Sequence, residues 1–200
     1  RVSTGSSLMR QTNVNYQEAQ RAEAQEAWSL AASAYLRALT LNPTTCSEAS
    51  DDLARLVTLS GDLKVRVLWA LGLVTLKRWP EAEAALAPLS DHPLNLSHTL
   101  TKRWTQLKER RAEDGVSLSL WVRALQLTDR VLSMGYPAEA LSLVERAVTQ
   151  ISSPEKSALV LYEGARLGIM HQQVQAGVAM MREAIARQEL LRERARRLVD

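Results

Sequence analysis

Apolar and small side chains recur along most of the chain at steps of three and four, the spacing that places them on one face of an α-helix. In the first such segment these positions are Ala19, Ala22, Ala27, Leu30, Ala31, Ala34, Tyr35, Ala38 and Leu41. The pattern is interrupted around residues 25–27, and Pro43 follows it. Because proline lacks an amide hydrogen and clashes with the preceding turn, a helix ends before it. The segment therefore predicts two helices joined by a short break.

The same pattern returns in three later segments, at residues 65–93, 121–154 and 158–186. The first of these breaks at residues 78–80, where Pro80 fits the first turn of a second helix. In the next one, Gly135 can adopt the left-handed conformation that ends a helix, and Pro137 can begin another. We therefore expect four helical hairpins.

Each predicted hairpin carries a small residue in its second helix, namely Ala31, Ala82, Ala140 and Gly177. In two hairpins a small, a large and a small residue precede a proline, as Ala31, Tyr35, Ala38 and Pro43 and, with the proline late, as Ala140, Val144, Ala147 and Pro154. Together with Ala19 in the first helix, this pattern resembles tetratricopeptide repeats. The resemblance implies a right-handed α-solenoid, in which small residues let two antiparallel helices approach closely.

The spacing of the hairpins is irregular. Corresponding small residues lie 51, 58 and 37 positions apart, whereas a regular array keeps about 34. Two further segments, residues 47–61 and 95–115, read as extra inserted helices, the first capped by Ser47 or Ser50. They could equally be degenerate repeats or half-repeats.

Composition supports an all-α fold. The chain of 200 residues has no Phe and only 4% aromatic residues, with 8 Gly and 6 Pro, and its abundant Ala, Leu, Arg and Glu favour helix over strand. The opening residues are polar and lack the helical pattern. We expect a flexible lead at residues 1–12, a helical-repeat domain at residues 13–186, and a C-terminal capping helix at residues 187–200.

The candidate chemistry of the chain is sparse. Cys46 is the single cysteine, and the three histidines share no metal-ligand spacing with it or with one another. No glycine-rich phosphate loop occurs. We therefore expect no catalytic residue, metal or cofactor. No apolar run is long enough to span a membrane, and the cytoplasm is the expected compartment.

Basic residues cluster in two segments, around residues 102–111 and 182–197, although the net charge is only +3. Such clusters suit a regulatory or nucleic-acid-associated helical domain. Glutamates interleave them, which is also typical of a solvated helix surface. The last helix could alternatively support self-association.

The resemblance implies a concave surface lined by the first helix of each hairpin. Aligning the hairpins puts these residues on it: Tyr16, Gln20, Glu23, Lys64, Leu71, Gln126, Asp129, Tyr162, Arg166 and Met170. The set mixes charged, amide and aromatic groups and lacks the cluster of Lys, Asn and Arg that clamps a peptide carboxylate. The leading hypothesis is a non-catalytic scaffold or adaptor that binds a peptide or helix of a partner protein in this groove.

Overall fold

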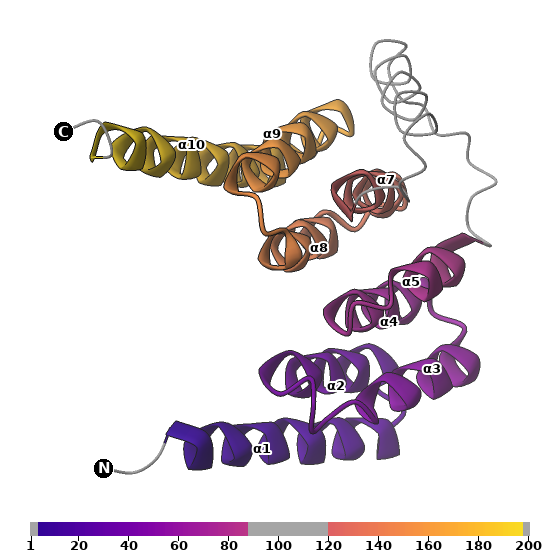
Figure 1. The fold of residues 1–200 in the computed structure, drawn as a ribbon. Coiled ribbons are helices and arrows are strands. Elements are labelled where there is room, and N and C mark those ends of the chain that lie inside the picture. Colours follow the sequence, from indigo (N-terminus) through magenta and orange to yellow (C-terminus); the bar gives the residue numbers. More distant parts are fainter. Residues whose placement is uncertain (1–3, 88–119, 198–200) are drawn as a thin grey trace. The chain divides into compact units, whose positions relative to one another are not determined.

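The computed structural model describes residues 4–87 and 120–197, and these residues form nine α-helices and no β-strand (Figure 1). The helices are α1 (Thr4–Ala24), α2 (Trp28–Leu41), α3 (Ala49–Ser60), α4 (Leu63–Thr75), α5 (Trp79–Leu86), α7 (Leu120–Ser133), α8 (Pro137–Gln150), α9 (Pro154–Met170) and α10 (Val174–Arg197). The all-α expectation is confirmed for this part of the chain.

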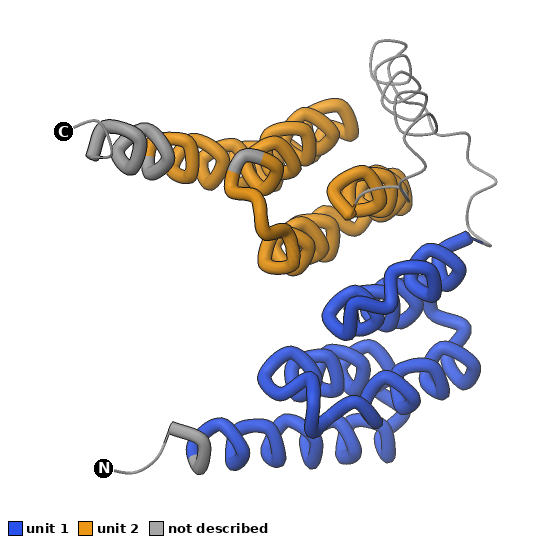
Figure 2. The backbone as a smooth tube through the Cα atoms, viewed as in Figure 1, with its two compact units in different colours: residues 1–88 blue, residues 89–200 orange. Residues whose placement is uncertain are grey.

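The chain divides into two compact units, residues 1–88 and residues 89–200 (Figure 2). In the first unit, α1 packs on α2, and α3 packs on both α2 and α4. Helix α5 packs on α4. In the second unit, α9 packs on α7, α8 and α10, and α7 also packs on α8. Each unit has its own set of buried leucines.

The same tight turn joins the two helices of α1/α2, α4/α5, α7/α8 and α9/α10. One residue in each turn has a positive φ: Glu26, Lys77, Gly135 and Gln172. At the second turn, the Arg78 N–H donates to the Leu73 carbonyl at 2.8 Å and the Lys77 N–H donates to the Val74 carbonyl at 3.0 Å. The other three turns repeat this pair of bonds, the Schellman motif that satisfies the last carbonyls of a helix. The three breaks predicted from the sequence, at residues 25–27, at residues 78–80 and between Gly135 and Pro137, are confirmed.

Small residues lie where the paired helices come closest. Ala31, Ala82 and Ala140 are fully buried, and Gly177 is buried at the equivalent place. A Cβ atom added to Gly177 would lie only 2.9 Å from the Ala165 carbonyl oxygen of the neighbouring helix. A larger side chain there would push the two backbones apart.

The first extra helix predicted at residues 47–61 is confirmed as α3, but its predicted serine cap is wrong. The residue before the helix is Glu48, which makes no side-chain cap bond, and the Ser50 hydroxyl donates to the Ser47 carbonyl instead. A backbone turn supplies the missing bonds, because the Ala49 N–H donates to the Cys46 carbonyl at 2.9 Å. The helix therefore needs no serine oxygen at its start.

Both ends of the predicted repeat domain differ from expectation. Helix α1 already begins at Thr4, and Thr12 is buried, so residues 4–12 of the segment expected as a flexible lead are helical. The Thr12 hydroxyl donates to the Leu8 carbonyl at 2.8 Å, which satisfies this polar group inside the helix. At the other end α10 runs unbroken through residue 187, because no Gly or Pro interrupts it there.

Pro154 begins α9 rather than ending the preceding hairpin, since a proline is tolerated in the first helical turn. The second inserted helix, predicted at residues 95–115, lies outside the described residues, as does the basic cluster at residues 102–111. None of the described helices is both long and apolar enough to cross a membrane.

Candidate interaction surface

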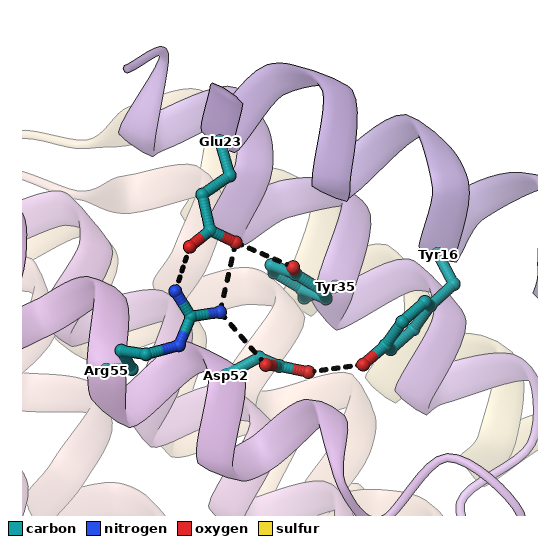
Figure 3. A network of polar contacts seen from close by, with 5 residues as sticks. All are labelled: Tyr16, Glu23, Tyr35, Asp52 and Arg55. Carbon is teal, nitrogen blue, oxygen red and sulfur yellow. Dashed lines mark hydrogen bonds and ion pairs between the residues drawn. The ribbon is translucent and has the colours of Figure 1, made fainter. Parts of the chain in front are cut away.

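A polar network joins α1 to α3 (Figure 3). The Tyr16 hydroxyl donates to Asp52 at 2.7 Å, and the Tyr35 hydroxyl donates to Glu23 at 2.8 Å. The Arg55 guanidinium bridges the two carboxylates, at 3.0 Å from Asp52 and 3.0 Å from one Glu23 oxygen. The rings of Tyr16 and Tyr35 meet edge to face, with centroids 5.4 Å apart. Tyr16 and Glu23, both predicted in the groove, are therefore engaged within the molecule.

Both tyrosines of this network are held in the neutral form. The hydrogen bond to Asp52 and, next, burial raise the pKa of Tyr16 to about 12. Burial, followed by the charge of Asp52, raises the pKa of Tyr35 to about 12. A neutral phenol keeps the hydrogen that each carboxylate accepts, so the network stays intact over the whole physiological pH range.

A buried carboxylate connects α7 to the end of α9. Asp129 is only 2% exposed, and its Oδ1 lies 2.7 Å from Nε2 of His171, the residue that follows α9. A buried carboxylate needs such a partner. Asp129 therefore serves the packing of the two helices, and it is not open to a partner protein as the sequence analysis expects.

We call the residue with a positive φ in each of the four turns the turn residue. Counting back from it aligns the first helices of the four hairpins. The positions ten, six and three residues before the turn residue are Tyr16, Gln20 and Glu23 in α1, Val67, Leu71 and Val74 in α4, Leu125, Asp129 and Leu132 in α7, and Tyr162, Arg166 and Ile169 in α9. All six residues in α4 and α7 are at most 2% exposed. This face is thus a helix-packing face in α4 and α7, which corrects the prediction that Leu71 and Asp129 line an open groove.

The same face is open in α9. Tyr162 is 44% exposed and Ile169 is 51% exposed. The side chain of Arg166 is 34% exposed and forms an ion pair with Glu163 at 3.3 Å. These groups occupy positions that neighbouring helices cover in α4 and α7, and here they face solvent.

The second helices of the hairpins also differ in whether aligned positions are buried or exposed. The positions six, nine and thirteen residues after the turn residue are Ala32, Tyr35 and Leu39 in α2, Leu141, Val144 and Val148 in α8, and Val178, Met181 and Ile185 in α10. In α8 this face packs on α9, since Val144 Cγ2 lies 3.4 Å from where a Cβ on Gly164 would be. In α10 the residues are also apolar, yet Val178 is 39% exposed and Ile185 is 51% exposed.

The open residues of α9 and α10 form one continuous face. Val174, Val178, Met181 and Ile185 are spaced four, three and four residues apart, so they lie in one stripe along α10. Ile169 joins this stripe to α9, because its Cγ1 lies 3.1 Å from where a Cβ on Gly177 would be. We call this surface the terminal face; it consists of Tyr162, Arg166, Ile169, Val174, Val178, Met181 and Ile185.

Of the other predicted groove residues, Gln20 is exposed, while Lys64 and Gln126 are half-buried. Met170 is 39% exposed next to the terminal face. Of the predicted groove residues, Tyr162 and Arg166 thus belong to the terminal face and Met170 lies next to it, whereas the α10 stripe was not predicted. The signal was present in the spacing of its apolar residues, and only the structure shows that no described helix of the second unit covers Val174, Val178 and Ile185.

Three observations on the described residues concern metal binding, thiol reactivity and the basic stretch of α10. The described residues contain no group of three or more His, Cys, Asp and Glu residues that could hold a metal ion, and burial raises the pKa of the Cys46 thiol, which disfavours the nucleophilic thiolate. In the basic stretch of α10, Arg187 pairs with Glu183 at 3.2 Å. The side chains of residues 190–197 lie outside the described part.

The fold defines the class of this protein as an all-α chain of helical hairpins. No family model, no curated protein and no solved structure matches the chain. The resemblance to tetratricopeptide repeats therefore stays a prediction from the residue pattern.

Proposed function

We propose that this protein is a non-catalytic interaction module, a scaffold or adaptor built as an irregular right-handed solenoid of tetratricopeptide-like hairpins with inserted helices. Its partner is a protein, and the docking element is an α-helix. The terminal face is the docking site, in place of the concave groove expected from the sequence. Tyr162 and Arg166 belong to the residue types that most often anchor such contacts.

One observation carries the proposal. Positions that are buried in α4 and α7 are occupied in α9 by Tyr162 and Ile169, which are at least 44% exposed. Positions that are buried in α2 are occupied in α10 by Val178 and Ile185, which are at least 39% exposed. Single exposed apolar residues are ordinary on a protein surface, but a contiguous apolar face marks an interaction site. A helix laid on this face would bury it as α9 buries the equivalent face of α8.

Photo-crosslinking in cells that produce the protein tests the proposal. A benzophenone amino acid replaces Val178 on the terminal face, and in a matched control it replaces Thr149, an exposed residue of α8. We expect a covalent protein adduct from position 178, its loss when Ile185→Asp is added, and no adduct from position 149. Absence of any adduct at position 178, or equal labelling at both positions, would contradict the proposal.

A further inference from the structure

The terminal face is the counterpart, one hairpin later, of a face that α9 covers inside the second unit. In the aligned register, Arg166 of α9 takes the place of Asp129 in α7, and Met181 of α10 takes the place of Val144 in α8. Helix α9 packs on both α7 and α8. Resting on the proposed function, we propose that the docking helix of the partner protein carries a carboxylate that binds Arg166 and, seven residues before it, a Gly or Ala that contacts Met181.

Helix α9 contacts α8 through a small residue. A Cβ added to Gly164 would lie 3.4 Å from Val144 Cγ2, which is an ordinary van der Waals distance. Alanine would therefore fit against Val144, whereas a longer side chain would push the two helices apart. Met181, at the equivalent position, is longer than valine. The residue of the docking helix that contacts Met181 should therefore be no larger than alanine.

Apolar residues accompany Gly164 along α9. Val160 lies four residues before it and Leu167 three residues after it, and both are at most 1% exposed. This spacing places all three on one side of the helix. On α10, Val178 and Ile185 are the exposed apolar residues that such side chains would cover. The docking helix therefore needs an apolar residue four positions before its small residue and another three positions after it.

Helix α9 contacts α7 through a polar pair. His171, seven residues after Gly164, places its Nε2 atom 2.7 Å from Oδ1 of Asp129. This contact gives the buried carboxylate the partner that it needs. On the terminal face Arg166 stands in place of Asp129, so the charge at this position is reversed. A helix docked in the same register brings its own residue at the position of His171 to Arg166, and a carboxylate is the group that best matches a guanidinium.

Arg166 is available for such a carboxylate. It is the only charged residue of the terminal face, and its side chain is 34% exposed. Its Nη1 atom donates to Glu163 at 3.3 Å, while Nη2 and Nε form no hydrogen bond with any residue in the described part of the chain. Glu163 is only 5% exposed, so a partner cannot reach it. A docking helix without an acceptor would bury the remaining N–H groups of Arg166 at a cost in desolvation.

The first helices of a second copy do not meet these requirements. In α1 the residue in the register of Gly164 is Glu18, whose side chain is 60% exposed and pairs with Arg37. The residue in the register of His171 is Gln25, a neutral amide. Helices α4 and α7 carry a tryptophan and a leucine in the register of the small residue. The required pattern therefore fits a helix of a different protein.

Fluorescence anisotropy with labelled peptides and the full chain tests the inference. The probe is the sequence of residues 154–173 with His171→Glu, because this segment already carries the small residue and both apolar residues. The matched peptide carries His171→Gln. We expect the glutamate peptide to bind about three- to tenfold more tightly, because only its carboxylate forms an ion pair with Arg166. It cannot replace α9 within the protein, since its carboxylate would then lie against Asp129. Equal affinities, or tighter binding of the glutamine peptide, would overturn the inference.

Variants of the protein test whether Arg166 is the group that selects the carboxylate. Arg166→Gln should bind both peptides alike, and Arg166→Lys, which keeps the charge, should retain part of the preference. The matched control is Arg182→Gln, because Arg182 is an exposed arginine of α10 outside the terminal face; it should keep the preference. Ile185→Asp should weaken the binding of both peptides, with unchanged helical circular dichroism. A preference that survives Arg166→Gln would refute the assignment.

These results separate the inference from the proposed function. A protein adduct at position 178, together with equal binding of the two peptides, would refute the carboxylate and leave the interaction module in place. No adduct and no binding of either peptide would refute both. An adduct, together with a preference for the glutamate peptide that disappears in Arg166→Gln, supports both.

Discussion

Gly177 is the residue at which α9 and α10 come closest. We expect Gly177→Ala to lower the free energy of unfolding by about 1–3 kcal/mol, because the new methyl group meets the Ala165 carbonyl oxygen at 2.9 Å and the backbones must separate. This loss outweighs the gain of about 1 kcal/mol that alanine brings over glycine within a helix. Urea unfolding followed by circular dichroism measures the difference.

The matched control for this prediction is Gly164→Ala in the same helix pair. Its new methyl group would meet Met180 Sδ at 3.0 Å, but a methionine side chain is flexible and can move aside. We expect this variant to be close to neutral. Equal destabilisation by the two substitutions would show that the backbone contact at Gly177 costs no more than the side-chain contact at Gly164.

Tyr16 of the α1–α3 network makes the free energy of unfolding depend on pH in the alkaline range. The pKa of Tyr16 rises from 10.0 to about 12 in the folded protein. The stabilisation from its hydrogen bond to Asp52 is complete below the unfolded pKa and is lost as the pH rises through the folded pKa, so stability falls between pH 10.0 and about 12. Tyr16→Phe should make this decline shallower. Urea unfolding at pH values of about 9 and about 11 measures it, and an unchanged decline in Tyr16→Phe would contradict the assignment.

At the scale of whole helices, the hydrogen bond between Asp129 and His171 joins α7 to the end of α9. We expect His171→Ala to lower the free energy of unfolding by about 1–3 kcal/mol, since it leaves the Asp129 carboxylate buried without this partner. The equivalent position in α4 is Leu71, which is buried without needing a hydrogen bond. Adding Asp129→Leu to His171→Ala should therefore recover stability. Thermal melts of both variants measure this, and a double variant less stable than His171→Ala alone would disprove the role.

The hairpins themselves could be predicted because their signals are local. Pro80 and Pro137 begin helices and Gly135 ends one, since proline and glycine restrict or free the backbone wherever they stand. The beginning of α1 could not be predicted in this way. Thr12 and Asn15 look like loop residues in the sequence, and they are helical because α1 packs on α2 and buries them.

The candidate site could be predicted only in part, for the same reason. Tyr162, Arg166 and Leu71 lie on the same face of their helices, and the sequence cannot tell which of these faces another helix covers. Coverage depends on contacts between residues far apart in the chain, such as the one between Asp129 and His171. The prediction of a groove therefore included buried and exposed residues alike.

At the scale of the whole molecule, the division into two units predicts that the first unit folds alone. It contains a core of its own, in which Leu39, Leu53 and Leu71 are at most 2% exposed. We expect residues 1–88, produced separately, to give a helical circular dichroism spectrum and a cooperative thermal transition. A gradual, non-cooperative melt would show that the first unit depends on the second.

The sequence by itself determined that this protein is helical, where its hairpin turns fall, and which small residues let paired helices touch. These properties follow from the spacing of apolar residues and from proline and glycine, which act on the backbone within a few residues. Only the tertiary structure decided which apolar faces are covered. Ile185 and Val148 are similar residues at equivalent positions, but Ile185 is 51% exposed and Val148 is 4% exposed, because burial depends on the neighbouring helix and not on the residue alone.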